Sequence, residues 1–325
     1  MKRKLVQHGN TSLTVSLPKK WTDRFNLKKG DEIELVENDA SILLKADGHS
    51  EAPIKKGILD ISKLGVLTRR SFDAMYKAGY DEIEVLFDHP SQLKMIETAV
   101  DHEAMTFEIV KVEKNRCIVK NISEADTKEF DNLLRRTLML LKVMGDDLLV
   151  AMKNSDATTI VNIKNMELTN NKFTHFCRRA LAKSGYKDYN KTVFMYTIVE
   201  QLETVADEFK FLCDYLIETI AKETAKPGKN LKKKVKKNGG KLNISPETIK
   251  LFEGVNTSIS MFNELFFNYN LEKAKQFGEH RRKVVAEGFK ILERKNNEEK
   301  IIAHYLINIQ KMIFDMFGPV MALVL

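Results

Sequence analysis

From about Asp126 to the C-terminus, the chain shows almost no strand signals, and its apolar residues recur with helical spacing. The first stretch places apolar side chains three and four residues apart, at Leu134, Leu138, Leu141, Leu148, Leu149 and Met152. Further helices are predicted over residues 166–184, 192–224, 245–268, 270–294 and 297–325. The order long, middle, long occurs twice around a lysine-rich interruption, which indicates an internal duplication of three-helix units.

The segment before these helices is of a different kind. A chain of 325 residues is too long for one ordinary core, and 43% apolar residues are enough to build several. The predicted fold is therefore multidomain, with an N-terminal β domain, a small α/β middle domain and an all-α C-terminal region. We place their boundaries at residues 1–46, 54–122, 126–225 and 245–325, with a lysine-rich linker over 226–244.

Residues 1–46 are predicted to form four short strands. The segment 12–17 alternates with period two, Pro18 ends it, and residues 19–25 make one or two helical turns. Strands over 32–36 and 41–45 follow. Four strands of this length cannot bury enough apolar area alone, so dimerisation is expected.

Residues 54–122 alternate strand and helix signals. Strands are predicted over 58–61 and 82–87, helices over 68–78 and 90–103, and a hairpin turns at Lys114-Asn115. The resulting βαβαββ order is typical of a small α/β sandwich.

The cysteines and the C-terminal apolar segment indicate where in the cell the protein is found. Cys117, Cys177 and Cys213 are odd in number and far apart, which favours neither a disulfide framework nor a zinc site and indicates a cytoplasmic protein. The apolar segment 312–325 is shorter than the roughly 20 residues of a membrane span and contains Asp315. We therefore predict a buried terminal helix and no integral membrane segment.

Positive charge is concentrated in two patches. The net charge is +8, and residues 226–241 alone hold eight lysines and no acidic residue. A second basic excess lies in the first thirty residues. Such patches favour contact with a polyanion. For the lysine-rich segment, DNA or acidic lipid and a solvated linker are both open interpretations.

The N-terminal patch predicts a DNA-binding site. Basic side chains that could hold phosphates are Lys2, Arg3, Lys4, Lys19, Lys20 and Arg24. Gln7, Asn10 and Thr11 could meet base edges. The alternative is a solvated basic face on a dimerisation module.

The same residues carry a resemblance. The sequence KRKLVQHGNTSLTVSLPKKWTDRFNLKKGDEIELVEND is similar to the SpoVT/AbrB-type swapped-hairpin domain, with Gly9, Ser16-Leu17-Pro18-Lys19, Trp21 and Leu27-Lys28-Lys29-Gly30-Asp31 at the family's motif positions. This resemblance implies a dimer that exchanges hairpins and binds DNA with its basic residues.

The helical region resembles PhoU-type phosphate-regulation proteins, which are two three-helix bundles. The segment from Val199 to Asp207 is similar to that family's Glu-x-x-x-Asp metal-binding motif. In the corresponding helix of the second repeat, Asn308, Lys311 and Asp315 stand at the equivalent positions, so a second metal site is not expected. The full domain order resembles archaeal phosphate uptake regulators.

The acidic motif can also be interpreted from its spacing. Glu200, Glu203 and Asp207 lie at i, i+3 and i+7, so they are expected to share one helix face at the bundle surface. Their oxygens suit a divalent or iron-type metal ion. The alternative is a solvated acidic face on which Lys210 pairs with Asp207.

Together these features predict a non-enzymatic regulator. The seven histidines show no ligand spacing and are expected at surface or packing positions, and no phosphate-binding or nucleophile motif occurs. The predicted function is a dimeric DNA-binding transcriptional regulator of phosphate uptake. The alternative is an adaptor whose helical bundles contact the ATPase of a phosphate transporter or a sensor kinase. A metal-dependent hydrolase is a third class.

Overall fold

A computed structural model describes residues 1–38, 41–46, 54–123, 129–225 and 241–325 of the chain. These residues form two compact units, Met1–Lys56 and Gly57–Leu325. Two predicted segments fall outside the described residues: the start of the helical region at 126–128, and residues 226–240 of the lysine-rich linker.

The N-terminal unit consists of two hairpins and one short helix. Its elements are β1 (Val6–His8), β2 (Ser12–Thr14), α1 (Lys19–Arg24), β3 (Glu34–Asn38) and β4 (Ser41–Lys45). Strand β1 pairs with β2 and β3 with β4, both antiparallel. Gly9 takes a positive φ of 69° between β1 and β2, a conformation that glycine adopts without steric cost. The predicted small β domain is confirmed.

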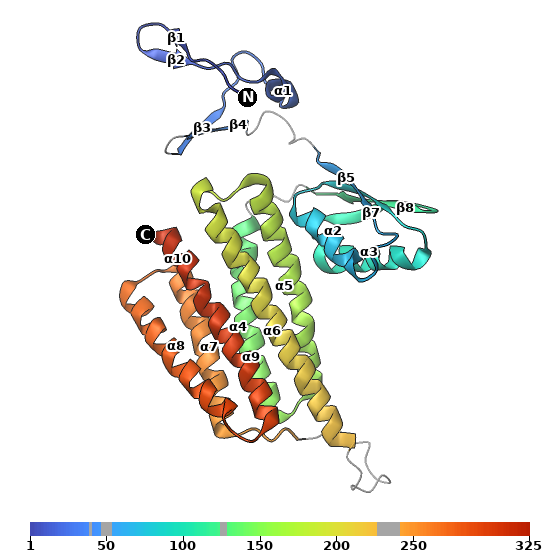
Figure 1. Cartoon of the computed structure of the whole chain (residues 1–325), viewed down its shortest axis with the longest axis vertical. Coiled ribbons are helices and arrows are strands. Elements are labelled where there is room, and N and C mark those ends of the chain that lie inside the picture. The colour runs from blue at the N-terminus through green and yellow to red at the C-terminus, as the bar shows by residue number, and fades with distance from the viewer. Residues whose placement is uncertain (39–40, 47–53, 124–128, 226–240) are drawn as a thin grey trace. The chain divides into compact units, whose positions relative to one another are not determined.

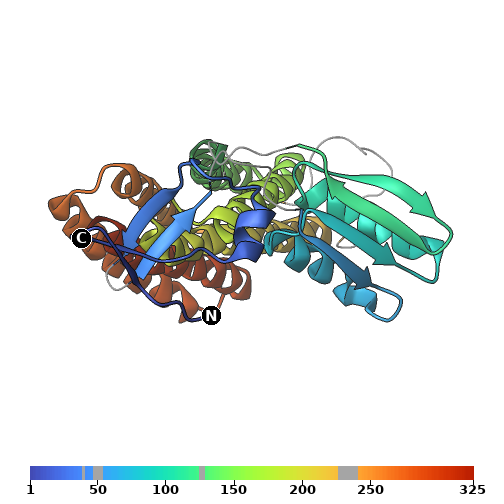
Figure 2. The same ribbon diagram turned by 90° about the horizontal axis from the view of Figure 1, so that it is seen from above.

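A four-stranded sheet and two helices form the middle region (Figures 1 and 2). In chain order the elements are β5 (Lys56–Asp60), the 3-10 turn η1 (Gly65–Leu67), α2 (Thr68–Lys77), β6 (Glu82–Leu86), α3 (Pro90–Glu103), β7 (Phe107–Glu113) and β8 (Arg116–Asn121). The strands lie side by side in the order β5-β6-β8-β7. The predicted α/β region is confirmed.

One face of this sheet is buried and the other is not. Alternate residues of β6, Ile83 and Val85, are fully buried, and α2 and α3 lie on that side (Figure 1). Edge strand β7 pairs with β8 through a register shift between Ile109 and Lys111, which is a β-bulge.

The rest of the larger unit is helical, as predicted. The helices are α4 (Glu129–Asn154), α5 (Ala157–Ser184), the 3-10 turn η2 (Tyr189–Lys191), α6 (Thr192–Ala225), α7 (Pro246–Phe267), α8 (Leu271–Leu292), α9 (Asn297–Asp315) and α10 (Phe317–Val324). Helices α4, α5 and α6 contact one another, and so do α7, α8 and α9. Helix α4 also packs on α7 and α6 on α9, so both sets enclose one continuous apolar core.

Gly145 is one reason why α4 and α7 approach so closely. A Cβ atom at this buried position would lie 2.5 Å from Oδ1 of Asn256 on α7 and 3.4 Å from the ring of Phe209 on α6. Contacts of 2.5 Å do not occur for real Cβ atoms, so glycine is required by space rather than by its backbone conformation.

Two helix boundaries differ from the prediction. Helix α5 begins at Ala157 rather than Met166, because Asp156 caps it by accepting hydrogen bonds from the N–H groups of Thr158 and Thr159. The C-terminal helix is interrupted at Met316, so α9 and α10 replace a single helix.

Among the described residues, the stretch Asn297–Val324 is the one helical segment long and apolar enough to cross a membrane by length and composition. One face of α9 packs against α6, α7 and α8 and buries Ile302, Leu306 and Ile309. The buried carboxylate of Glu299 on this helix accepts hydrogen bonds from the Ser245 amide and the Thr248 hydroxyl.

Candidate nucleic-acid interface and buried ionic cluster

All nine residues that the sequence predicts for DNA contact are exposed. Lys2, Arg3 and Lys4 lead into β1, which carries Gln7. Asn10 and Thr11 lie in the turn between β1 and β2. In the antiparallel pairing of β1 with β2, Gln7 lies opposite Leu13. The hairpin therefore presents polar side chains at its tip and basic ones before its first strand.

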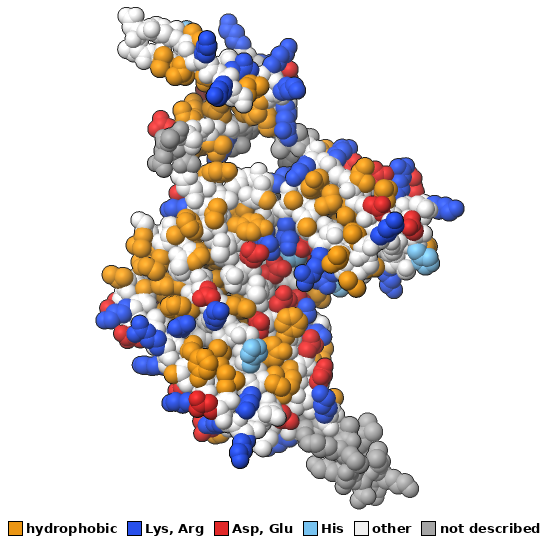
Figure 3. Space-filling view, viewed as in Figure 1, with side chains coloured by type: hydrophobic (Ala, Val, Ile, Leu, Met, Phe, Trp, Pro, Cys, Tyr) orange, Lys and Arg blue, Asp and Glu red, His pale blue; other side chains and the backbone are white. Residues whose placement is uncertain are grey.

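Helix α1 supplies the other basic residues. Pro18 precedes the helix in extended conformation, and the exposed Lys19, Lys20 and Arg24 follow. Lys20 and Arg24 are four residues apart and so lie on one side of the helix. Figure 3 shows several Lys and Arg side chains on this unit.

The same unit exposes apolar side chains. Leu5, Val6, Leu13, Leu35 and Ile42 are each more than half exposed, and none of the described residues of Met1–Lys56 is buried. A unit without a buried core is not expected to be stable alone. A second copy of the unit would cover these side chains.

Comparison with protein-family models gives a match over residues 6–57, to a family described as "Antidote-toxin recognition MazE, bacterial antitoxin". No curated protein and no solved structure matches the chain. The match supports an N-terminal MazE/AbrB-like domain of the swapped-hairpin, DNA-binding kind. It does not extend to the helices, so the PhoU resemblance stays a prediction.

The predicted metal residues on α6 lie in two different surroundings. Glu203 was expected at the surface, but its side chain is only 20% exposed, because it lies against α5. Glu200 and Asp207 are more exposed. Arg178 of α5 donates to both Glu203, at 2.8 Å, and Glu200, at 3.1 Å. These two carboxylates therefore share one buried guanidinium group.

Asp207 belongs to a separate group. Lys210 pairs with Asp207 at 3.7 Å, as predicted. It also pairs with the buried Glu167 at the shorter distance of 3.0 Å. Burial raises the pKa of Asp207 to about 6, and Glu167 adds to the rise while Lys210 opposes it. A metal ion held jointly by Glu200, Glu203 and Asp207 does not fit this arrangement.

A buried ionic cluster links the α/β region to the helices. His175 on α5 is 2% exposed, with its Nδ1 atom 3.0 Å from Asp73 on α2 and its Nε2 atom 3.2 Å from Glu203 on α6. Burial alone would lower the pKa of His175, but the two carboxylates outweigh it and raise the pKa. Burial likewise opposes ionisation of Glu203, yet His175 and nearby cations lower its pKa to about 2.

Further ion pairs surround this histidine. Asp73 pairs with Lys77 at 2.5 Å within α2, and the buried Glu103 at the end of α3 pairs with Arg69. Figure 3 shows acidic and basic side chains together where the α/β region meets the helices. We call Asp73, Glu103, His175 and Glu203, with their cationic partners, the interface cluster.

Arg179 is the main polar anchor beside this cluster. Its guanidinium group donates to the carbonyl oxygens of Tyr76 and Tyr80 and to the carboxylate of Asp81, at 2.5 to 2.9 Å. It also lies over the rings of Tyr76 and Phe107. Tyr76 is in the last turn of α2, where carbonyl groups lack helical partners and the helix dipole favours a cation.

The interface cluster was not predicted from the sequence. His175 was expected to be an ordinary surface or packing residue. One signal was available, because polar residues on α5 recur three and four residues apart at Glu167, Asn170, Asn171, Thr174, His175, Arg178 and Arg179, and all are buried. In a sequence such a stripe has the same pattern as a solvated helix face. Its partners on α2 and α3 are too distant along the chain to be paired by spacing.

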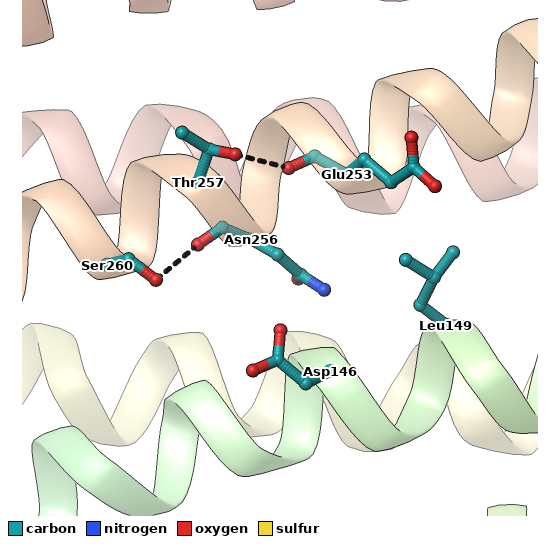
Figure 4. A pocket seen from close by; sticks show the side chains of 6 residues that line it. All are labelled: Asp146, Leu149, Glu253, Asn256, Thr257 and Ser260. Carbon is teal, nitrogen blue, oxygen red and sulfur yellow. Dashed lines mark hydrogen bonds between the residues drawn. The ribbon is translucent and has the colours of Figure 1, made fainter.

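A shallow polar pocket lies between α4 and α7 (Figure 4). Asp146 and Asn256 face one another across it, and Leu149, Glu253, Thr257 and Ser260 complete its lining. The side-chain oxygen and nitrogen of the buried Asn256 have no hydrogen-bond partner among the described residues. Asp146 itself pairs with Lys142 at 2.6 Å. The pocket therefore brings together two carboxylates, two hydroxyl groups and an amide.

Proposed function

We propose that this protein is a dimeric DNA-binding transcriptional regulator whose helical region reports a cellular state to the N-terminal domain. The observation that carries the proposal is the MazE/AbrB-like match over residues 6–57, on a unit whose six predicted basic contact residues are all exposed. Lys2, Arg3, Lys4, Lys19, Lys20 and Arg24 hold DNA phosphates in this proposal, and Gln7, Asn10 and Thr11 meet bases.

We further propose that the state reported is phosphate supply. The support is the resemblance of the helical sequence to PhoU-type proteins, together with the repeated order of long helices. The proposal assigns no catalytic reaction to the chain and places it in the cytoplasm. Direct binding of phosphate forms no part of it.

A salt series of binding to labelled duplexes from the protein's own genome tests the DNA-binding function. Full-length protein should prefer particular duplexes over a shuffled one, and affinity should fall steeply with salt. A variant with Arg3, Lys4, Lys19 and Lys20 changed to alanine should lose the preference. If all four contact phosphates in both subunits of the dimer, eight contacts are removed, and the slope of log affinity against log salt should fall in magnitude by roughly 7.

A matched control separates position from net charge. Changing Lys232, Lys233, Lys234 and Lys236 to alanine removes the same charge from the lysine-rich segment. This control should keep sequence preference. Equal losses in both variants, or no binding near physiological salt, would contradict the DNA-binding function.

The adaptor remains the second candidate, and exposed apolar residues on α4 favour it. Met139, Val143 and Val150 follow one another at helical spacing and are 43 to 59% exposed. A charged residue at Val143 should abolish capture of a phosphate-transporter ATPase in the adaptor case, and should leave operator binding unchanged.

A further inference from the structure

Three ligand-type side chains meet inside the interface cluster. Asp73 on α2, Glu103 on α3 and His175 on α5 each offer one donor atom, and these atoms lie within 4.8 Å of one another. Their residues are 9%, 3% and 2% exposed. Bonds of about 2.0–2.2 Å keep the donor atoms on one ion within roughly 4.4 Å of one another, so these side chains would draw together by up to about 0.4 Å on binding an ion.

The donor atoms are also poorly satisfied by the protein itself. Neither ring nitrogen of His175 has a well-aligned hydrogen bond among the described residues, although carboxylate oxygens lie 3.0 and 3.2 Å away. The same holds for Oδ1 of Asp73 and Oε1 of Glu103. Arg69 lies against Oε1 of Glu103 and His175 against Oδ1 of Asp73, so these atoms have ionic contacts. They lack the well-aligned hydrogen bonds that buried polar atoms normally make, and a bound ion would supply directed bonds instead.

Charge balance allows that ion to be a divalent cation. Asp73 and Glu103 are neutralised by Lys77 and Arg69, which carry two positive charges in total. The Arg69 side chain is 45% exposed, and Lys77 lies in the last turn of α2. One divalent ion carries the same charge as Arg69 and Lys77 together, and these two cations would turn away from the carboxylates when it binds. His175 would release its proton and bind as the neutral imidazole.

The surroundings of the histidine resemble those of a metal ligand. A metal-bound histidine usually donates its second ring N–H to a carboxylate, which fixes its tautomer and orientation. Here Nδ1 faces Asp73 while Nε2 faces Glu203, and Glu203 is itself held by Arg178. Nδ1 would therefore bind the ion and Glu203 would orient the ring.

We propose that Asp73, Glu103 and His175 bind one divalent first-row transition-metal ion of the Zn²⁺ type. One imidazole and two carboxylates suit such an ion, and three protein ligands leave a position open. Two ligands come from the α/β region and one from the helices. An ion bound at this site would link the two regions. The site is distinct from the acidic motif on α6.

Zinc binding by the full-length, chelator-treated protein tests the proposal. We expect one ion per chain by elemental analysis after dialysis against Zn²⁺, with the affinity taken from calorimetry. His175→Gln and Glu103→Gln should each lose this ion. Glu203→Gln should keep it with about 10- to 100-fold weaker affinity.

Two controls remove exposed groups outside the cluster. His304→Gln on α9 and Glu200→Gln on α6 should bind zinc as the wild type does. Circular dichroism establishes that each variant is folded. Absence of zinc from the wild type, or its retention in a folded His175→Gln or Glu103→Gln protein, would overturn the site.

X-ray absorption at the zinc edge gives a readout that needs no variant. The wild-type spectrum should contain oxygen ligands and a single imidazole. Two or more imidazoles, or sulfur, would place the ion elsewhere and refute the proposal even if every variant failed to fold.

Discussion

In the N-terminal unit, apolar side chains such as Leu13 and Ile42 are more than 60% exposed, whereas at the interface of α2 with α5 charged side chains such as Asp73 and Arg179 are buried. Each arrangement is costly in an isolated chain. The first would be relieved by the second copy of the proposed dimer, because the unit has too few residues to cover itself. The second is relieved within the chain by paired opposite charges. The exposed apolar surface is therefore suited to bind another molecule, whereas the buried charges fix the position of α2 on α5.

The largest effect is expected from charging the apolar surface of the N-terminal unit. Leu13→Asp places a carboxylate where dimerisation would bury a leucine, so the dimer should dissociate and DNA binding should be lost. Sedimentation equilibrium measures the first change. The matched control is Val112→Asp on β7, which is 54% exposed in the other unit and should leave the dimer intact. Loss of the dimer in both variants would contradict the comparison.

The next effect concerns the buried charges. Arg179→Ala leaves Asp81 and the carbonyl oxygens of Tyr76 and Tyr80 without this donor. Breaking a buried charge pair by removing one partner costs about 3–5 kcal/mol, and the loss here should lie at or below that range because Lys183 still pairs with Asp81. Denaturant unfolding should show that loss. Arg136→Ala on the exposed face of α4 should change the free energy of unfolding by less than about 0.5 kcal/mol. If both variants lost the same free energy of unfolding, Arg179 would contribute no more to stability than an exposed arginine.

Substitutions at two glycines test how closely the helices pack. Gly145→Ala should destabilise the protein by about 1–3 kcal/mol, because its new Cβ would overlap Asn256. Gly278→Ala on α8 meets nothing within 4 Å and should stabilise the helix by up to about 1 kcal/mol. Thermal unfolding of both variants gives the signs. A stabilised Gly145→Ala protein would show that α4 and α7 pack less closely.

The smallest effect is a pH dependence at Asp207. Its pKa is raised to about 6 from an ordinary 3.8, so the folded state retains a proton that the unfolded state has released. The free energy of unfolding should therefore fall as pH rises from about 4 to 6. Asp207→Asn should remove this decline, whereas Asp315→Asn at an exposed position should not. Identical pH profiles for wild type and Asp207→Asn would contradict the raised pKa.

Local signals explain which parts of the fold could be predicted. The bounds of α3 agree with the prediction because Pro90 and Ser91 mark its start and strand signals resume after Glu103. Helix α5 was predicted to begin nine residues late, since its first turns hold mostly exposed or half-buried polar residues and bury only Ile160 and Ile163. No local signal distinguishes those residues from a solvated face.

The candidate sites also differ in whether neighbouring residues in the sequence identify them. The basic residues of the N-terminal unit could be predicted because they lie within a few residues of one another and are exposed. Glu203 could be recognised as part of an acidic motif, but its partners could not. His175 lies on the preceding helix and Asp73 a further hundred residues back, so only tertiary packing brings them together.

The bulge on β7 has a consequence for growth of the sheet. Edge strands offer unpaired backbone groups to which another chain can add, and a bulge twists these groups out of line. The irregularity lies between Ile109 and Lys111, on a strand that also carries Glu108 and Glu113. Strand β7 is thus a poor template for intermolecular pairing, and chains that associate in concentrated solution should do so through other surfaces.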